Sequence, residues 1–174
     1  VAECFGTFAL TFVAAGAEMI AVLSGGEVSA AARAIAPGLT VMAMIYAVGD
    51  SSGAHFNPAV TLALTLRGKM TPREAWQYVL SQLVGAMIGV WAAHVMFDLP
   101  VWQLSTTVRS GSGQWFAEFI ATFGLLLTIF GCAAAAPAST AYAVGLYITA
   151  AYWFTASTSF ANPAVTIARA LSDT

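Results

Sequence analysis

Long runs of apolar residues, separated by short polar breaks, dominate the chain. A helix rises about 1.5 Å per residue, so about 20 residues cross a hydrocarbon core of ~30 Å. The runs show no ten-residue alternation of the kind found in barrel strands. The pattern therefore predicts transmembrane helices over residues 2–23, 37–49, 75–97, 115–136 and 140–156. The second is short unless its helix begins upstream, near residue 30.

Composition agrees with a membrane protein. The chain has 174 residues, of which 59% are hydrophobic and 8% are charged, whereas roughly a quarter are charged in a soluble domain. Six Lys and Arg residues are too few for the basic face that a nucleic acid requires. The two cysteines, Cys4 and Cys132, lie inside apolar runs, which argues against a disulfide scaffold. We expect an all-α integral membrane protein in a lipid bilayer, with no nucleic-acid partner.

Basic residues predict the orientation in the membrane. Arg67, Lys69 and Arg73 cluster in the break between the second and third spans. Cytoplasmic loops carry an excess of Lys and Arg. This break and the N-terminus are therefore expected in the cytoplasm, and the protein in the cell (inner or plasma) membrane as a multi-pass protein.

The chain contains an internal repeat. Residues 2–8 resemble residues 117–123, and the five residues 57–61 recur letter for letter at 162–166. The first unit, residues 1–97, holds three spans, and this odd number turns the second unit upside down in the membrane. A connection over 98–113 leads to the second unit, residues 114–174, which holds two spans. A sixth span is expected to be missing, so the pattern indicates a truncated chain.

Both copies of the repeat contain Asn-Pro-Ala at the start of a stretch too short to cross. Asn is a strong N-cap and Pro is favoured at the first helical position. The motifs predict re-entrant half-helices over 58–66 and 163–171. Irregular backbone inside a membrane is tolerated where it lines a water-filled cavity, so residues 49–56 are expected to present carbonyl groups to one.

Inversion brings the two half-helices together, N-terminus to N-terminus, near the membrane midplane. Each N-terminus carries about half a positive charge, so the pair forms a barrier to cations. Asn57 and Asn162 can still offer amide N–H groups to water or a hydroxyl group. Such an arrangement excludes protons and ions and admits small neutral molecules.

These residues resemble the aquaporin (major intrinsic protein) family over essentially the whole chain. The resemblance implies six spans and two half-helices per protomer, a pore in each protomer, a homotetramer, and passive conduction of water or small uncharged solutes without a cofactor. It rests on Ala2-Glu3, Gly6-Thr7-Phe8, residues 52–61, Ser81-Gln82, Gly85-Ala86, Gly89, Ala117-Glu118-Phe119 and Asn162-Pro163-Ala164. The pore motifs are then Asn57, Pro58, Ala59, Asn162, Pro163 and Ala164.

The resemblance also implies supporting residues around the half-helices. The family buries acids at the positions of Glu3 and Glu118 against the loop backbone, which fits the need of an intramembrane carboxylate for partners. His55 is expected to order the loop before Asn57, with the backbone of Ala54, His55 and Phe56 facing the pore. No Cys or carboxylate group accompanies His55, so no metal site is expected.

The selectivity filter departs from the family pattern. Val165 stands where the family has an arginine directly after the second motif, and Pro37 stands where an aromatic residue is usual. The fifth-span position is Tyr152 when counted from Gly145, or Ala150 when counted back from the motif. Ser159 supplies the remaining loop position. A filter without the arginine is typical of a bacterial subgroup often linked to arsenic-resistance gene clusters.

Arg169 lies four residues after Val165, on the same face of the half-helix. One hypothesis is that Arg169 partly replaces the missing filter charge. The favoured alternative is an exposed residue at the pore mouth, paired with Asp173 or with a lipid headgroup.

The sequence thus predicts a channel for glycerol-like or neutral metalloid solutes and water. Two alternatives within transport are a water-selective aquaporin and an ion-coupled secondary transporter, since inverted repeats and broken helices occur in transporters too. A non-conducting structural role is the third. Neither histidine stands at catalytic spacing from an acid or a serine, so no enzyme is expected.

Overall fold

The computed structural model describes residues 1–26 and 29–173, and this part of the chain is helical, without strands. The single-turn helix η1, Pro137–Ser139, joins α5 to α6. The α-helices are α1 (Ala2–Leu23), α2 (Ala30–Ser52), α3 (Pro58–Leu66), α4 (Pro72–Met96), α5 (Ser112–Ala135), α6 (Thr140–Phe154) and α7 (Pro163–Arg169).

All five predicted spans are helices. The second begins at Ala30, capped by the Ser29 side chain, which accepts a hydrogen bond from the Ala32 amide. This helix continues through Pro37 and so reaches spanning length. The helices α1, α2, α4 and α5 are long and apolar enough to cross a membrane, whereas α6 has 15 residues.

The half-helices begin where the motifs predict. Asn57 caps α3 by accepting from the Ala59 amide at 2.9 Å, and Pro58 is the first helical residue. Asn162 caps α7 in the same way through the Ala164 amide at 3.0 Å. The prediction of a helix up to residue 171 is wrong by two residues, because the chain after Arg169 tightens into a turn in which the Leu171 amide bonds the Ala168 carbonyl.

Glycines allow the long helices to approach closely. A Cβ atom at Gly85 would lie 2.1 Å from the Cys4 carbonyl oxygen, and one at Gly89 would lie 2.2 Å from Thr11 Oγ1. The contact of α2 with α6 is equally tight, since a Cβ atom at Gly38 would lie 2.5 Å from the Gly145 oxygen. Small residues at such contacts are the usual means of packing helices in membranes.

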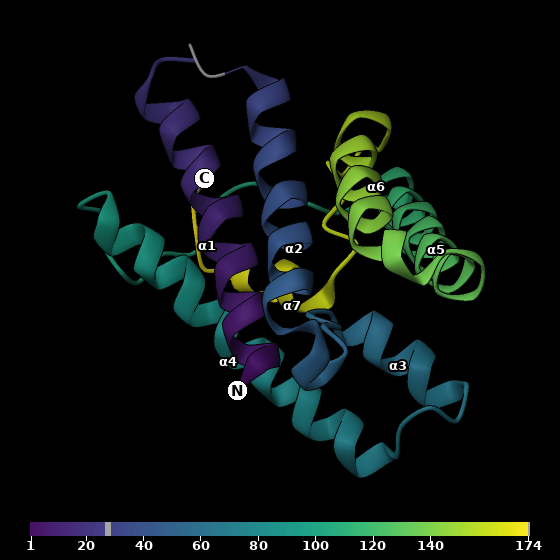
Figure 1. Ribbon diagram of the computed structural model, residues 1–174. Helices are drawn as coiled ribbons and strands as arrows, with labels where there is room; N and C mark the ends of the chain where they lie inside the picture. Colours follow the sequence, from purple (N-terminus) through teal and green to yellow (C-terminus); the bar gives the residue numbers. More distant parts are fainter. Residues whose placement is uncertain (27–28, 174) are drawn as a thin grey trace.

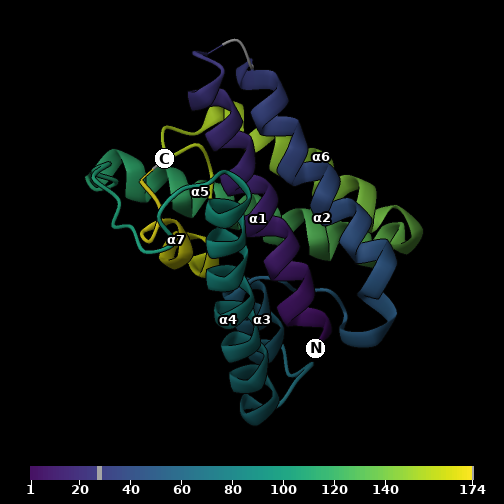
Figure 2. The same cartoon turned by 90° about the vertical axis from the view of Figure 1, so that its left-hand side faces the viewer.

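The two half-helices meet in the middle of the bundle. Figures 1 and 2 show α1 and α2 side by side, α4 behind α1, the α5–α6 pair beyond α2, and α7 between α4 and the α5–α6 pair. The N-terminal ends of α3 and α7 face each other there, because Asn57 and Asn162 hydrogen-bond across the junction.

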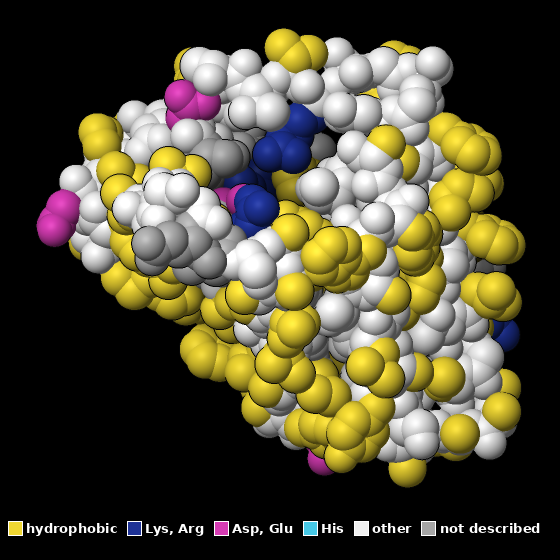
Figure 3. All heavy atoms as spheres, turned by 90° about the horizontal axis from the view of Figure 1, so that it is seen from above, with side chains coloured by type: hydrophobic (Ala, Val, Ile, Leu, Met, Phe, Trp, Pro, Cys, Tyr) yellow, Lys and Arg dark blue, Asp and Glu magenta, His cyan; other side chains and the backbone are white. Residues whose placement is uncertain are grey.

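Large apolar side chains cover the outside of the bundle. Phe119 is 61% exposed, Phe123 58% and Leu127 64%, and Figure 3 shows apolar side chains along the flanks of the molecule. A surface of this kind marks contacts with lipid or with other protein subunits. The boundaries of the two repeats and their connection remain predictions, and residues 27, 28 and 174 lie outside the described part of the chain.

Candidate functional site: a pore around the paired asparagines

The two loops that precede the asparagines share one backbone conformation. Three matching positions in each loop have a positive φ, a region that non-glycine residues visit rarely. The pairs are Gly53 (79°) with Thr158 (59°), Ala54 (50°) with Ser159 (53°), and Phe56 (49°) with Ala161 (45°). Unusual conformations of this kind persist only where the surroundings impose them.

Glu3 imposes the conformation of the first loop. Its side chain is 3% exposed. One oxygen accepts from the Ser52 hydroxyl at 2.6 Å and the His55 amide at 3.0 Å, and the other accepts from the Phe56 amide at 2.8 Å and the Gln82 side chain at 2.7 Å. Four donors satisfy this carboxylate away from water, and the two amides it binds fix the direction of the neighbouring carbonyl groups.

Glu118 has the same function in the second loop. It accepts from the Ser157 hydroxyl at 2.5 Å, the Phe160 amide at 2.9 Å and the Ala161 amide at 2.7 Å. Its donors occupy the positions of the repeat that match Ser52, His55 and Phe56. Both acids therefore bind loop amides, and their role in supporting the loops remains a prediction.

The asparagines join the two loops. Asn57 Nδ2 donates to the Ala161 carbonyl at 2.6 Å, and Asn162 Nδ2 donates to the Phe56 carbonyl at 2.8 Å. An amide nitrogen carries two hydrogens, so each side chain keeps one donor that this bond does not use. Both side chains line open space on either side of the junction.

Two cavities meet at the asparagines. The arginine cavity, named for Arg33, Arg109 and Arg169 in its wall, contains about 830 Å³ of empty space including its mouth. The histidine cavity, lined by His55, contains about 600 Å³. Their walls share residues at the junction, so the two cavities adjoin there. The shared residues are Leu10, Asn57, Leu125, Ile148 and Asn162.

The loops form one wall of each cavity. The arginine cavity is lined by Ser159, Phe160 and Ala161, and the histidine cavity by Ala54, His55 and Phe56. His55 Nδ1 lies 3.0 Å from Thr61 Oγ1, so its ring is tied to α3. The role of His55 in ordering the loop remains a prediction.

The predicted filter residues lie together. Pro37, Tyr152, Ser159 and Val165 all line the arginine cavity. The alternative fifth-span residue, Ala150, is exposed and does not line it. Counting forward from Gly145 therefore identifies the residue that lines the cavity, Tyr152. Counting back from the second Asn-Pro-Ala motif does not, because the loop between α6 and this motif is short.

Glu18 was not predicted as a site residue, yet it organises this cavity. Its carboxylate accepts from Arg33 Nη1 at 2.9 Å and from the Tyr152 hydroxyl at 3.1 Å. These contacts connect α1 with α2 and α6 around the mouth. A signal was available, because Glu18 and Arg33 are isolated charges near the ends of two apolar runs joined by a short loop.

Arg169 lies in the wall of the cavity. Its side chain is 4% exposed, so the favoured expectation of an exposed residue at the mouth is wrong. Asp173, its expected partner, instead accepts from the Thr106 hydroxyl at 2.7 Å and the Thr106 amide at 2.8 Å. The helix buries Arg169 because it lies one turn beyond Val165 on the face directed into the bundle.

Comparison with known proteins assigns this architecture. The family model described as "Major intrinsic protein" matches residues 1–140. The chain belongs to the major intrinsic protein family. The aquaglyceroporin AqpS of Rhizobium meliloti (strain 1021) is 44% identical over 176 residues, which cover all of this chain and 76% of that protein.

Two further relatives support the assignment. Aquaporin NIP1-1 of Zea mays is 41% identical over 135 residues, covering 76% of this chain and 48% of that protein. The X-ray structure of the aquaglyceroporin from Plasmodium falciparum superimposes with a TM-score of 0.75 at 25% identity, covering 98% of this chain and 76% of that one.

Membership in the major intrinsic protein family determines the class of function. The protein is a multi-pass membrane channel that conducts small uncharged molecules passively, and it is not an enzyme. This favours the main prediction over a coupled transporter or a purely structural role. Among the described residues there is also no cluster of His, Cys, Asp and Glu side chains that could bind a metal ion.

Proposed function

We propose that this channel conducts glycerol-sized neutral solutes, neutral metalloid acids and water along the path from the arginine cavity to the histidine cavity. The observation that carries the proposal is Val165, which lines the arginine cavity, as does Pro37. Neither residue offers a hydrogen-bond donor or a charge at its side chain. A larger solute with an apolar backbone therefore passes this position at a lower cost in free energy than it would beside a fixed guanidinium group.

The chemistry of the walls matches such solutes. Loop carbonyl groups and the asparagine amides form a polar side, whereas Leu10, Leu125 and Ile148 form an apolar side. A polyol has hydroxyl groups along one edge and C–H groups along the other, so it can satisfy both sides at once. Neutral metalloid acids carry hydroxyl groups at similar spacing.

Exclusion of cations follows from the half-helices. The N-termini of α3 and α7 face the junction, where each contributes about half a positive charge. A cation or a hydrated proton would have to lose water beside these two positive ends. The remaining N–H group of each asparagine side chain can bind only a hydrogen-bond acceptor, such as the hydroxyl oxygen of a passing solute.

Stopped-flow light scattering of proteoliposomes tests the proposal. We expect glycerol flux without a pH or sodium gradient, and Val165→Arg should lower the permeability to glycerol by at least about tenfold, which corresponds to about 1.4 kcal/mol. Water permeability should fall less. Water flux without glycerol flux in the unmodified protein would establish the water-selective alternative, and equal losses for both solutes would refute the filter role of Val165.

Arg169 joins the proposed filter as its cation. It stands one helical turn from Val165, and its buried side chain forms part of the same wall. Arg169→Gln should change the ratio of glycerol to water permeability, while an unchanged ratio would assign Arg169 to the structure alone.

We further propose a homotetramer in the cell membrane with a cytoplasmic N-terminus. The exposed apolar flanks of the helices provide surface for both subunit and lipid contacts. In this orientation the break with Arg67, Lys69 and Arg73 is cytoplasmic and the arginine cavity opens outward. Crosslinking in native membranes tests the oligomeric state, and the detection of monomers alone would refute the tetramer. Labelling of single cysteines from either side of the membrane tests the orientation, and labelling of residue 69 from the outside would refute it.

A further inference from the structure

Positive charge is concentrated at one end of the pore. The chain has six Lys and Arg residues, and three of them, Arg33, Arg109 and Arg169, line the arginine cavity. They come from α2, from the segment between the repeats, and from α7. Figure 3 looks down on this end and shows basic side chains gathered inside a hollow rather than spread over the rim.

Among the described side chains that line the cavity, basic groups outnumber acidic groups. Glu18 is the acidic residue among the described residues that line the cavity, and it already accepts from Arg33 and Tyr152. Three guanidinium groups and one carboxylate leave a formal charge of +2. In a cleft with low-dielectric walls, charges of one sign focus the field and raise the local concentration of the opposite ion.

Arg109 is held where it can meet an incoming anion. Its guanidinium carbon lies 4.8 Å from the centre of the Phe160 ring. Phe160 belongs to the second pore loop and lines the same cavity. An arginine has five donors in a fixed plane, so the contact of this one guanidinium group with a ring leaves donors for an anion.

Arg33 adds donors beyond those that the protein uses. Its Nη1 binds Glu18 at 2.9 Å, whereas its buried Nε has no hydrogen-bond acceptor among the described residues. A buried donor without an acceptor costs about 1–3 kcal/mol. This end of the pore therefore has an excess of donors as well as an excess of positive charge.

We infer that the arginine cavity is a binding site for a small oxyanion, such as a phosphate or a carboxylate, which Arg109 holds at the mouth of the pore in the positive field of Arg33 and Arg169. Guanidinium groups bind such anions through paired, charge-assisted hydrogen bonds. The bound anion stops there, because Pro37 and Val165 offer no donors to replace its water. It occupies the solute path and acts as a competitive blocker.

The binding itself does not depend on which neutral solute permeates, whereas the block of glycerol flux rests on the proposed function. Binding is therefore measured first, by titrating inorganic phosphate into the full-length protein in a detergent without phosphate groups. We expect saturable binding that weakens as sodium chloride is raised. The same titration of Arg109→Ala should show affinity at least about tenfold lower, a loss of about 1.4 kcal/mol.

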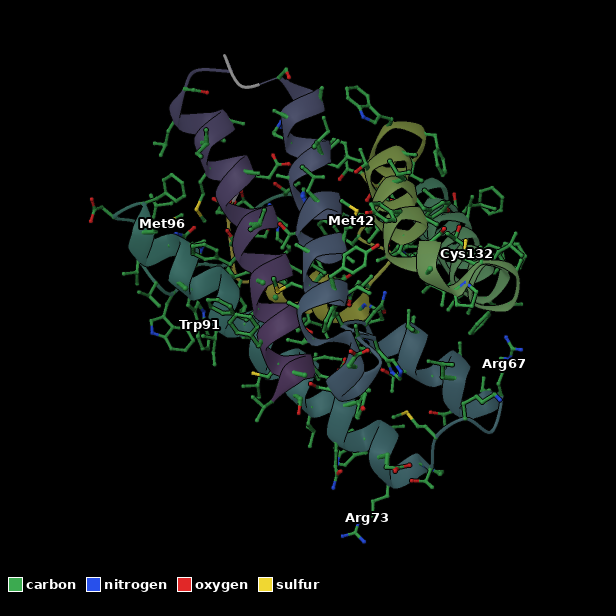
Figure 4. All side chains as sticks on the ribbon, in the orientation of Figure 1. Met42, Arg67, Arg73, Trp91, Met96 and Cys132 are labelled. Carbon is green, nitrogen blue, oxygen red and sulfur yellow. The ribbon has the colours of Figure 1, made fainter. Side chains whose placement is uncertain are left out.

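Arg73→Ala is the matched control. Arg73 is exposed and points away from the bundle at the end of α4 opposite the arginine cavity (Figure 4), so its loss removes the same charge from the protein without touching the site. A fall in affinity equal to that of Arg109→Ala would show a general charge effect and refute the site. Arg109→Lys keeps the charge without the planar fork and should bind with intermediate affinity.

Flux measurements then test the block. In phosphatidylcholine proteoliposomes at fixed ionic strength, phosphate on the side of the arginine cavity should lower glycerol permeability in the unmodified protein and in Arg73→Ala, but much less in Arg109→Ala. Adding anionic lipid without phosphate distinguishes a lipid headgroup from a free anion as the occupant: a block by the lipid alone would overturn the free oxyanion. No phosphate binding to the unmodified protein would overturn the site itself, and binding without any glycerol flux would refute the proposed function alone.

Discussion

Asn57 and Asn162 each donate to the carbonyl group of the residue that precedes the other. The bond from Asn57 reaches Ala161 at 2.6 Å, and the bond from Asn162 reaches Phe56 at 2.8 Å. The same two side chains also cap their own half-helices through their Oδ1 atoms. Each asparagine therefore joins a helix start, the opposite loop and the pore wall, a combination that requires both halves of an amide.

Replacement of Asn57 with alanine is expected to destabilise the junction of the half-helices. The change removes the cap on the Ala59 amide, worth about 1 kcal/mol, and leaves the buried Ala161 carbonyl without its donor, at about 1–3 kcal/mol. Thermal unfolding in detergent, followed by size-exclusion chromatography, measures the loss. Asn57→Asp retains the cap but cannot donate to Ala161, so its stability should lie between those of the unmodified protein and Asn57→Ala. If Asn57→Ala were as stable as the unmodified protein, the account would be contradicted.

Glu3→Gln should destabilise the first loop more than its small change in shape suggests. The Glu3 carboxylate accepts four hydrogen bonds, whereas a glutamine presents two donor hydrogens to some of the same donors. We expect a loss of about 2–4 kcal/mol, from two unmet bonds to a charged group at about 1.5–3 kcal/mol each, partly offset by the lower cost of burying a neutral side chain. Asp50→Asn, an exposed acid at the end of α2, is the control and should leave the unfolding temperature unchanged.

Removal of the Glu18 charge is expected to change both permeation and anion binding. In Glu18→Gln the Arg33 ion pair is lost, and the formal charge of the arginine cavity rises from +2 to +3. Phosphate should bind more tightly, by about three- to tenfold, because an exposed or half-exposed charge contributes about 1 kcal/mol. The ratio of glycerol to water permeability should shift because Tyr152 loses a charged acceptor, and titration together with stopped-flow flux measures both effects. Weaker phosphate binding would contradict the assigned charge balance.

Acid should weaken the contact between Thr106 and Asp173. The Thr106 hydroxyl, followed by its backbone amide, donates to Asp173 and lowers the pKa of that carboxyl from its ordinary value of 3.8. A lowered pKa in the folded state adds stability above the ordinary pKa, and this contribution is lost as the pH falls through the lowered value. The unfolding temperatures of the unmodified protein and Thr106→Val should therefore differ at pH 7 and converge as the pH falls through the lowered pKa of Asp173. A gap that persists in acid would show that Thr106 acts through packing.

The start of each half-helix could be predicted from the sequence because a cap depends on neighbouring residues. Asn, Pro and Ala stand in order along the chain, and their preferences for the N-cap and the first turn act over a few residues. The end of the second half-helix was less predictable, because it depends on a turn that packs against α4 and the loop after it. The repeated motif, together with the odd number of spans in the first unit, predicted that the second unit is inverted in the membrane.

By itself the sequence determined that this is a helical membrane protein, where its spans lie, and which two motifs meet in its centre, since apolar length, capping and repetition are properties of adjacent residues. Only the tertiary structure decided that Glu18 binds both Arg33 and Tyr152, residues 15 and 134 positions away, and that Arg169 is buried in the wall rather than exposed. The physical reason is that these contacts depend on the rotation of four separate helices about their axes. That rotation is fixed by close glycine contacts and buried acids, and no single segment encodes it.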